Sequence, residues 1–255
     1  MTRHKQLVFF YFFPLFSVVI SLITHTNYLG SIIFFWVLPS LVLTIWAWNK
    51  TLKVLIFSLV GTIFLMTLDI IFYATKQWDT VSMFSDRFLG LVSWEDIPYF
   101  FLFVYFPVLF WEHFYERQTH EHLWKKSMTR LSGAFVIFLL SVLSAWAWVP
   151  FLIQIPYFYL NATLLLMVIP LLLELKTHPQ IGLRFFRIGS YFAYVAILYE
   201  LTALYLGLWS YPVNKFVRWI EIVGLRFPIE ELFAWILIGV VGVLTWYEYF
   251  DDDNH

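Results

Sequence analysis

The sequence predicts an all-α protein that is embedded in a membrane and crosses it about eight times. Three observations support this: hydrophobic residues make up 61% of the 255 residues, charged residues make up 13%, and the mean hydropathy is +0.77. Soluble domains have about 25% charged residues, so the polar side chains here are too few to cover a water-soluble surface. We therefore expect a lipid bilayer to surround most of the protein.

Apolar stretches that match the thickness of a bilayer follow one another along the chain. A transmembrane helix needs about 20 apolar residues, within a range of about 17–25. Eight stretches meet or approach this length: 6–23, 29–48, 53–74, 97–111, 130–149, 156–175, 186–207 and 227–247. The fourth is short and can extend back to about Trp94, and the seventh is interrupted by Glu200.

Lys and Arg in the predicted loops indicate how the spans are oriented. If the N-terminus lies inside, eleven of these residues fall on the cytoplasmic side: Arg3, Lys5, Lys50, Lys53, Arg117, Lys125, Lys126, Arg130, Lys176, Arg184 and Arg187. Five fall on the outer side: Lys76, Arg87, Lys215, Arg218 and Arg226. Cytoplasmic loops carry the excess of Lys and Arg, so we expect an integral protein of the cell membrane with both termini in the cytoplasm.

Uncommon residues recur at a nearly constant spacing, which predicts an internal duplication. Three pairs are 131 positions apart: Pro39 and Pro170, Asp69 and Glu200, and Trp78 and Trp209. Three later pairs are 135 positions apart, as a four-residue insertion in the second outer loop would produce: Glu95 and Glu230, Asp96 and Glu231, and Trp111 and Trp246. We expect a first repeat at 1–118, a cytoplasmic linker at 119–129, and a second repeat at 130–255 that ends in an acidic tail. Each repeat has four spans, so both share one orientation about an axis along the membrane normal.

Six carboxylic acids lie near one predicted depth, close to the outer boundary of the membrane. An ionised side chain at the centre of a membrane helix costs about 2.5–3.5 kcal/mol on insertion scales, so such residues are usually functional. The six are Asp69, Glu95, Asp96, Glu200, Glu230 and Glu231. Their convergence from the third, fourth, seventh and eighth spans makes them the candidate catalytic residues.

A structural role is the alternative for some of these acids. Pro228 suits the first turn of a helix, and acids that follow it favourably oppose the helix dipole. Adjacent helical residues point about 100° apart, so Glu230 and Glu231 are not expected to face one pocket, and one of them can pair with Arg218 or Arg226. Asp69 and Glu200 lie near predicted helix C-termini, where the dipole disfavours an anion, so we expect each to be able to donate a proton.

Aromatic residues make up 22% of the chain, more than membrane-interface belts require. The face of an aromatic ring stabilises a desolvated cation by about 0.5–2 kcal/mol. Six aromatic residues near the acids are candidate substrate-binding residues: Trp78, Trp94, Trp209, Tyr211, Phe233 and Trp235. For each of them, a place in an interface belt is the alternative.

Several kinds of site are not expected. The chain has no cysteine, which excludes disulfides and thiolate catalysis, and its net charge of −1 argues against a nucleic-acid partner. It has no glycine-rich nucleotide fingerprint or P-loop, so no flavin or nicotinamide cofactor is evident. The His-Glu-His fragment at 120–122 is a weak candidate for metal binding, and we expect it to belong to a solvated loop instead.

Three stretches resemble the membrane-embedded lycopene cyclase domain family, which occurs as two small subunits or as one fused chain: YELTALYLGLWSYP (199–212), VGLRFPIEELFAW (223–235) and YEYFDDD (247–253). The family motif is Pro-x-Glu-Glu followed by aromatic residues, once per half. The second half matches it with Pro228, Glu230, Glu231 and Phe233. The first half is similar in FLMTLDIIFY (64–73), Trp78 and EDIPYFF (95–101), with Asp96 in place of the second Glu.

The resemblance implies a lycopene β-cyclase, an intramolecular lyase or isomerase of carotenoid biosynthesis that needs no redox cofactor. Its substrate would be lycopene or a related linear carotenoid, and other carotenoid-pathway enzymes are possible partners. Glu230 or Glu231 would be the principal acid, with Glu200 and Asp69 as a supporting acid or base. Glu95 and Asp96 would be their counterparts in the first half.

Three other interpretations remain open at this point. A related cyclase that acts on prenyl-extended carotenoids, or that makes a different ring isomer, would carry the same sequence features. A proton-coupled transporter also places carboxylates within the membrane and is often built from repeats. An inert membrane scaffold, in which the acids only cap helices, is the third.

Overall fold

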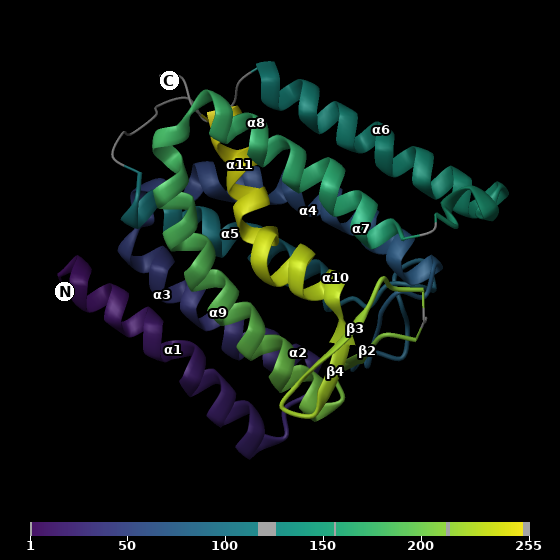
Figure 1. Ribbon diagram of the computed structural model, residues 1–255, viewed down its shortest axis with the longest axis horizontal. Helices are drawn as coiled ribbons and strands as arrows, with labels where there is room; N and C mark the ends of the chain where they lie inside the picture. The colour runs from purple at the N-terminus through teal and green to yellow at the C-terminus, as the bar shows by residue number, and fades with distance from the viewer. Residues whose placement is uncertain (1, 117–125, 156, 213–214, 252–255) are drawn as a thin grey trace.

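The computed structural model describes residues 2–116, 126–155, 157–212 and 215–251, and these form one predominantly helical bundle (Figure 1). Seven helical stretches among them are long and apolar enough to cross a membrane: Arg3–Thr24, Tyr28–Trp46, Trp48–Ala74, Asp96–Phe114, Phe158–Thr177, Pro179–Leu206 and Ile229–Tyr249. The prediction of a helical membrane protein is therefore confirmed. The remaining predicted span, 130–149, corresponds to helix α6 (Lys126–Trp148), whose apolar part, Ser132–Trp148, is shorter.

The seven stretches are built from the following helices. The first three are α1 (Arg3–Thr24), then α2 (Tyr28–Ile32) with η1 (Ile33–Val37) and α3 (Leu38–Trp46), then η2 (Trp48–Lys50) with α4 (Thr51–Ala74). The fourth is α5 (Asp96–Phe114), and the fifth joins α7 (Phe158–Thr163), η4 (Leu164–Val168) and α8 (Ile169–Thr177). The last two are η5 (Pro179–Ile181) with α9 (Gly182–Leu206), and α10 (Ile229–Glu231) with η6 (Leu232–Gly239) and α11 (Val240–Asp251).

Three of the spans contain a π-helical segment, namely η1, η4 or η6. No sequence pattern anticipates these segments. Segments η1 and η4 end two residues before Pro39 and Pro170. Each proline is the second residue of the helix that follows. Proline has no N–H and its ring clashes with the carbonyl four residues earlier, and a wider turn makes room for the ring. The carbonyl of Leu166, four residues before Pro170, instead accepts a hydrogen bond from the indole N–H of Trp246 at 2.7 Å. The helices continue through these segments.

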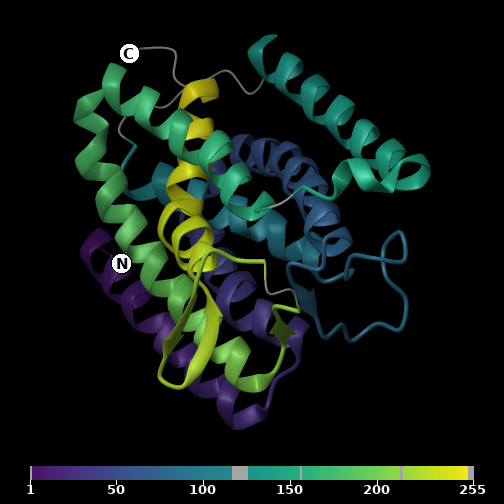
Figure 2. The same cartoon turned by 45° about the vertical axis from the view of Figure 1, so that its right-hand side comes forward.

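The first helix of each predicted half packs on the other half. Helix α1 contacts α9, and α6 contacts α4, so these two helices lie at opposite margins of the bundle (Figures 1 and 2). Helices α5 and α11 contact each other and form the centre. Together with the span that contains α4, these two are the most enclosed of the seven stretches.

Four short strands close one end of the bundle, which we call the strand end. They are β1 (Asp79–Thr80), β2 (Trp209–Ser210), β3 (Trp219–Ile222) and β4 (Leu225–Pro228). Strand β1 pairs antiparallel with β2, so that Thr80 lies opposite Trp209, and β3 pairs antiparallel with β4. The predicted start of the last span at 227 is therefore wrong by two residues, because Phe227 and Pro228 belong to a strand.

Two predicted connecting regions fall partly outside the described residues. Most of the linker at 119–129 lies there, and its last four residues are the first four of α6. Of the acidic tail, only Asp251 lies within the described helix α11.

Candidate active site

All six predicted acids are buried at the strand end, with at most 4% of any of these residues exposed. Asp69 and Glu200 lie near the ends of α4 and α9, and the two acidic pairs lie where α5 and α10 begin. Helix ends meet here because the spans alternate in direction. This geometry brings together acids that are distant in sequence.

A tryptophan nine residues later folds back over each of the two acids on α4 and α9. The indole N–H of Trp78 donates to Asp69 Oδ1 at 2.9 Å, and that of Trp209 donates to Glu200 Oε1 at 3.2 Å. After α4 the backbone turns into β1, and after α9 it turns into β2. The pairing of these two strands fixes both turns. The hydroxyl of Tyr211 also donates to Glu200 Oε1, at 2.8 Å.

Tyrosines hold the second acid of each adjacent pair. Tyr28 donates to Asp96 Oδ1 at 2.6 Å and Tyr73 donates to Asp96 Oδ2 at 2.8 Å. In the other half, the hydroxyl of Tyr159 donates to Glu231 Oε2. Tyr28 and Tyr159 are 131 positions apart, so a search for tyrosines at the spacing of the acids would have found them.

The first acid of each pair turns toward a loop instead. Glu95 accepts hydrogen bonds from Ser82 Oγ at 2.8 Å and from the backbone N–H of Met83 at 2.6 Å. Glu230 accepts one from the backbone N–H of Val217 at 2.5 Å. The expectation that adjacent acids point apart therefore holds in this geometry, and these two acids hold the loops that close the strand end.

The predicted ion pair between an acid and an arginine is not formed within the described residues. No ion pair joins Glu230 to Arg218 or Arg226. The guanidinium of Arg226 lies 4.8 Å from the centre of the Trp219 ring across the β3–β4 hairpin instead. A cation over an indole face is itself a favourable contact, and it keeps this arginine at the surface of the hairpin.

Glu200 and Glu231 share a small chamber with aromatic walls, which we call the acid chamber. Its volume is about 10 Å³, and its aromatic walls include Trp36, Trp78, Tyr99, Tyr199, Trp209 and Trp235. A cavity of this size holds about one water molecule. The two carboxyl groups therefore face a nearly dry space.

The walls of the acid chamber are held in fixed orientations. Trp235 stacks on Phe103 with 4.5 Å between the ring centres and an interplanar angle of 3°, and its indole N–H donates to the Tyr99 hydroxyl at 2.7 Å. Trp36 meets the rings of Tyr99 and Tyr199 edge-on, each at 5.8 Å. The indole N–H of Trp36 is buried and has no hydrogen-bond partner among the described residues.

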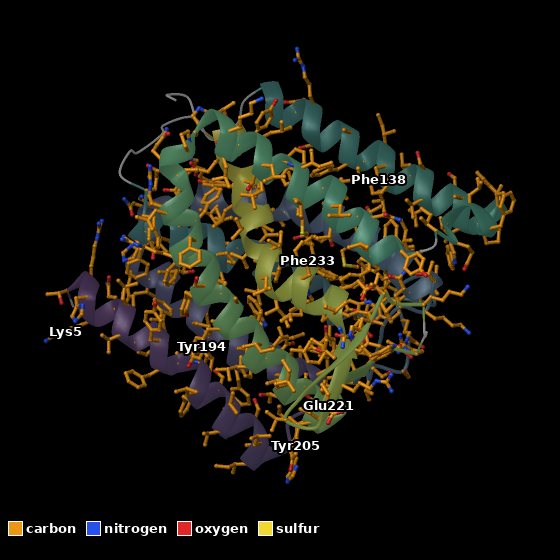
Figure 3. The ribbon with its side chains drawn as sticks, in the orientation of Figure 1. Lys5, Phe138, Tyr194, Tyr205, Glu221 and Phe233 are labelled. Atoms are coloured by element: carbon orange, nitrogen blue, oxygen red, sulfur yellow. The ribbon has the colours of Figure 1, made fainter. Side chains whose placement is uncertain are left out.

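The predicted aromatic residues divide into two groups. Trp78, Trp209 and Trp235 line the acid chamber, and Tyr211 is bonded to one of its acids. Trp94 is 43% exposed and packs on Phe88 in the loop before α5. Phe233 is half-buried on η6 near the middle of the bundle and does not line the chamber (Figure 3).

The wall residues Trp36, Tyr99 and Tyr199 were not singled out from the sequence. Trp36 lies inside an apolar span without a polar neighbour that would draw attention to it, whereas Tyr99 and Tyr199 lie close in sequence to Asp96 and Glu200. A further signal is that a buried Tyr hydroxyl or Trp N–H needs a partner, which becomes informative only when the helix faces are known.

Tyr211 lies outside the membrane-spanning stretches and is buried beside both chamber acids. Burial raises the pKa of its hydroxyl well above the usual value of 10.0, and the nearby Glu200 and Glu231 raise the pKa further. Tyr211 therefore stays a neutral hydrogen-bond donor throughout the neutral pH range.

Comparisons of the chain with protein-family models, curated proteins and solved structures give no match. Within the described ranges, no group of three or more His, Cys, Asp and Glu side chains is arranged to hold a metal ion. The fragment at 120–122 lies outside those ranges. Inferences about function therefore depend on the acid chamber and its surroundings.

Proposed function

We propose that the protein is a lycopene β-cyclase of the cell membrane, with both termini in the cytoplasm. It converts the linear ψ end groups of lycopene, or of a related carotenoid, into β-ionone rings without a redox step. The observation that carries the proposal is the pair Glu200 and Glu231, buried together in a nearly dry chamber with aromatic walls. Such a chamber suits a reaction that passes through a carbocation.

The proposed enzyme has eight spans in two fused repeats, one at 1–118 and one at 130–255. Contacts that recur at the spacing of the repeat support this. The Trp78–Asp69 hydrogen bond has its counterpart in Trp209–Glu200, and Tyr28–Asp96 has its counterpart in Tyr159–Glu231. The π-helical segments η1 and η4 precede prolines that are 131 positions apart.

The reaction begins with the transfer of one proton to the terminal alkene of the substrate. The proposed donor is Glu231, because it lines the chamber whereas its neighbour Glu230 bonds to a loop. Tyr159 holds Oε2 of Glu231 and so orients the carboxyl group toward the substrate. Protonation breaks the π bond and leaves a tertiary cation.

The neighbouring alkene then attacks this cation and closes a six-membered ring, which moves the positive charge onto a ring carbon. Loss of a proton from the adjacent ring carbon forms the β-ionone alkene. Glu200 receives this proton, and Tyr211, beside both acids, passes a proton to Glu231 while it takes the one that Glu200 received, so that all three groups return to their starting protonation states. One proton enters and one leaves, so the product is an isomer of the substrate.

The chamber walls protect the cation during these steps. Aromatic faces stabilise positive charge without acting as nucleophiles, whereas water would capture the cation as an alcohol. In this proposal Asp69 and Asp96 are positioning residues. Asp69 holds Trp78, which is part of the wall, and Asp96 holds Tyr28 and Tyr73.

The test is to express the chain in cells that accumulate lycopene and to separate the pigments. The wild-type chain should produce cyclised carotenoids, and the identity of the products will distinguish a β-cyclase from a cyclase that makes another ring isomer or that acts on prenyl-extended carotenoids. General acids contribute about 10²–10⁴-fold to rate, so Glu231→Gln should lower ring formation at least about 100-fold. Glu230→Gln is the matched control, because an amide oxygen still accepts the Val217 hydrogen bond.

Unchanged lycopene in cells whose membranes contain the folded wild-type protein would contradict the proposal. Equal activity of Glu231→Gln and Glu230→Gln would place the acid elsewhere. If the wild-type chain does not cyclise lycopene and membrane vesicles that contain it take up protons when a solute is added, a transporter becomes the better explanation.

A further inference from the structure

A larger cavity lies between α8 and α11, which run side by side at the end of the bundle opposite the strand end (Figures 1 and 2). We call it the Glu174 groove. Its volume is about 340 Å³. Ligand pockets have volumes of about 300–1,000 Å³, so one end of an amphipathic molecule fits here. The residues that matter in its lining are Pro170, Leu173, Glu174, Thr177, Thr245 and Trp246.

The corresponding place in the first predicted half is filled with apolar side chains. Three lining residues have apolar counterparts 131 or 135 positions earlier, at the spacing of the proposed repeat: Leu43 for Glu174, Trp46 for Thr177, and Phe110 for Thr245. Phe10, on α1, is fully buried there, with its ring centre 5.7 Å from that of Trp46 and 5.4 Å from that of Phe110. The groove is therefore open because smaller or polar side chains replace this packed core in the second half.

The polar groups of the groove offer mainly hydrogen-bond acceptors, because several donors are used within the protein. Thr177 and Thr245 each donate the hydroxyl hydrogen to the carbonyl four residues earlier in the helix, at 3.1 Å and 2.8 Å. Trp246 donates its indole N–H to the carbonyl of Leu166 at 2.7 Å. The lone pairs of the two hydroxyl oxygens remain for a ligand, which must therefore supply the donors.

The charge of the groove favours a cation. Glu174 is 7% exposed, and none of the described lining residues is Lys or Arg. Nδ1 of His178 lies 3.0 Å from Glu174 Oε1 and orients the carboxylate, which has about four acceptor positions in all. Trp246 and Tyr249 meet edge-on with 6.4 Å between ring centres, and aromatic faces also attract a cation. A protonated primary amine has both the charge and the donors that these groups require.

The groove changes from polar to apolar along α8. Thr177 is the last residue of its span, and Pro170 lies about 10 Å deeper, since a helix rises 1.5 Å per residue. Leu173, between them, is 60% exposed on the surface that faces lipid. Lys176 is exposed in the last turn of α8, three residues after Leu173 and so beside it on the helix. An amine that carries an acyl chain and a phosphate matches this order of groups.

We propose that the Glu174 groove binds a membrane phospholipid whose headgroup ends in a protonated primary amine, as in phosphatidylethanolamine. The ammonium group donates hydrogen bonds to Glu174 and Thr177 and lies against Trp246. The phosphate faces Lys176, and an acyl chain continues along Leu173 toward the middle of the membrane. The site is at the opposite end of the bundle from the acid chamber, so it does not depend on the proposed reaction.

The test compares three phospholipids with identical acyl chains: phosphatidylethanolamine, phosphatidylcholine and phosphatidylglycerol. Each is titrated into the full chain, purified in an uncharged detergent and freed of lipid, and binding is measured by native mass spectrometry. Charge-assisted hydrogen bonds are about twice as strong as neutral ones, so we expect phosphatidylethanolamine to bind at least about tenfold more tightly than the other two. The quaternary ammonium of phosphatidylcholine has no N–H to donate, and phosphatidylglycerol is an anion. Equal affinities for the three lipids would overturn the proposal.

The decisive variant is Glu174→Gln, which keeps the size of the side chain and removes its charge. We expect it to lower the affinity for phosphatidylethanolamine about tenfold and to leave that for phosphatidylcholine unchanged. The matched control is Glu221→Gln, at an exposed position on β3 at the strand end (Figure 3), and it should bind all three lipids as the wild-type chain does. An unchanged preference for phosphatidylethanolamine in folded Glu174→Gln contradicts the proposal.

A second variant, Thr177→Trp, covers the case in which Glu174→Gln does not fold, as judged by size-exclusion chromatography in detergent. Position 177 is exposed, so the fold should accept the larger side chain, which fills the groove as Trp46 does in the first half. It should abolish the binding of phosphatidylethanolamine, and retained binding would overturn the proposal. Free ethanolamine carries the same ammonium group without acyl chains. If it displaces phosphatidylethanolamine at equal concentration, the groove takes a soluble amine and the assignment to a lipid is wrong.

Discussion

The hydroxyl of Tyr159, on α7, donates a hydrogen bond to Glu231 at the end of α10, so that two spans far apart in sequence meet at one carboxyl group. The contact is buried at both ends. It leaves Glu231 facing the acid chamber while Glu230 faces a loop. We regard Tyr159 as the residue that decides which of the two adjacent acids can take part in chemistry.

Tyr159→Phe should therefore lower ring formation about tenfold or more without removing any carboxyl group. Leaving a buried polar group without its hydrogen-bond partner costs about 1–3 kcal/mol, and a misplaced acid loses rate steeply. The comparison is Tyr28→Phe, which removes the equivalent bond to Asp96, an acid that does not line the chamber. Initial rates of pigment formation, normalised to folded protein, check this. If Tyr159→Phe and Tyr28→Phe lower the rate of ring formation equally, the distinction between the two tyrosines is wrong.

The limits of several spans could be predicted closely, because hydropathy is a local property of the sequence, although the seventh, expected at 186–207, begins at Pro179. The third span was expected at 53–74, and α4 is Thr51–Ala74. The six acids could be found for a related reason, since a carboxylate next to an apolar span is conspicuous wherever it points. Their burial together at one end then follows from the alternating direction of the spans.

The walls of the acid chamber could not be predicted in the same way. Trp36 lies in a span that is almost entirely apolar, so no polar face indicates which way its side chain points. Tyr199 is next to Glu200, but adjacent helical residues point about 100° apart, so the acid does not show which way the tyrosine points. The π-helical segments make this harder, because each wide turn changes the phase of the residues after it. Trp235 lies inside η6, so a regular 3.6-residue helix would have placed it incorrectly relative to Glu231.

Trp235→Ala should change the product as well as the rate. Its indole ring stacks on Phe103 and closes the acid chamber, so its removal makes room for several water molecules. Water can then capture the cation before the ring proton is lost. We expect a fraction of the carotenoid to carry an added water, visible by mass spectrometry as a hydroxylated product. Phe233→Ala, outside the chamber, should yield none, and the same fraction in both variants would contradict the role given to the walls.

A buried ion cluster at the other end of the bundle should contribute more to the free energy of unfolding than an exposed ion pair does. Glu112 on α5 is 3% exposed, and its carboxylate lies 3.0 Å from Lys50 Nζ and 3.4 Å from Lys53 Nζ, while Tyr247 donates to it from α11. Breaking a buried pair leaves uncompensated charge, so Glu112→Ala should cost about 3 kcal/mol. The control is Asp79→Ala, which removes an exposed pair with Arg87 and should cost about 1 kcal/mol or less. Thermal unfolding in detergent compares the two, and equal midpoints would contradict the prediction.

The raised pKa of Tyr211 predicts how stability changes at alkaline pH. Its hydroxyl ionises near the usual value of 10.0 in the unfolded chain, whereas burial beside Glu200 and Glu231 holds the pKa well above that value in the folded protein. The stability linked to this group is therefore fully present below about pH 10 and is lost as pH rises from there toward the folded pKa. Tyr211→Phe cannot ionise, so its free energy of unfolding should fall less between about pH 9 and pH 11 than that of the wild-type protein. Tyr205→Phe, at a 69% exposed position, should follow the wild-type curve, and parallel curves for all three proteins would show that Tyr211 ionises as readily in the folded state as in water.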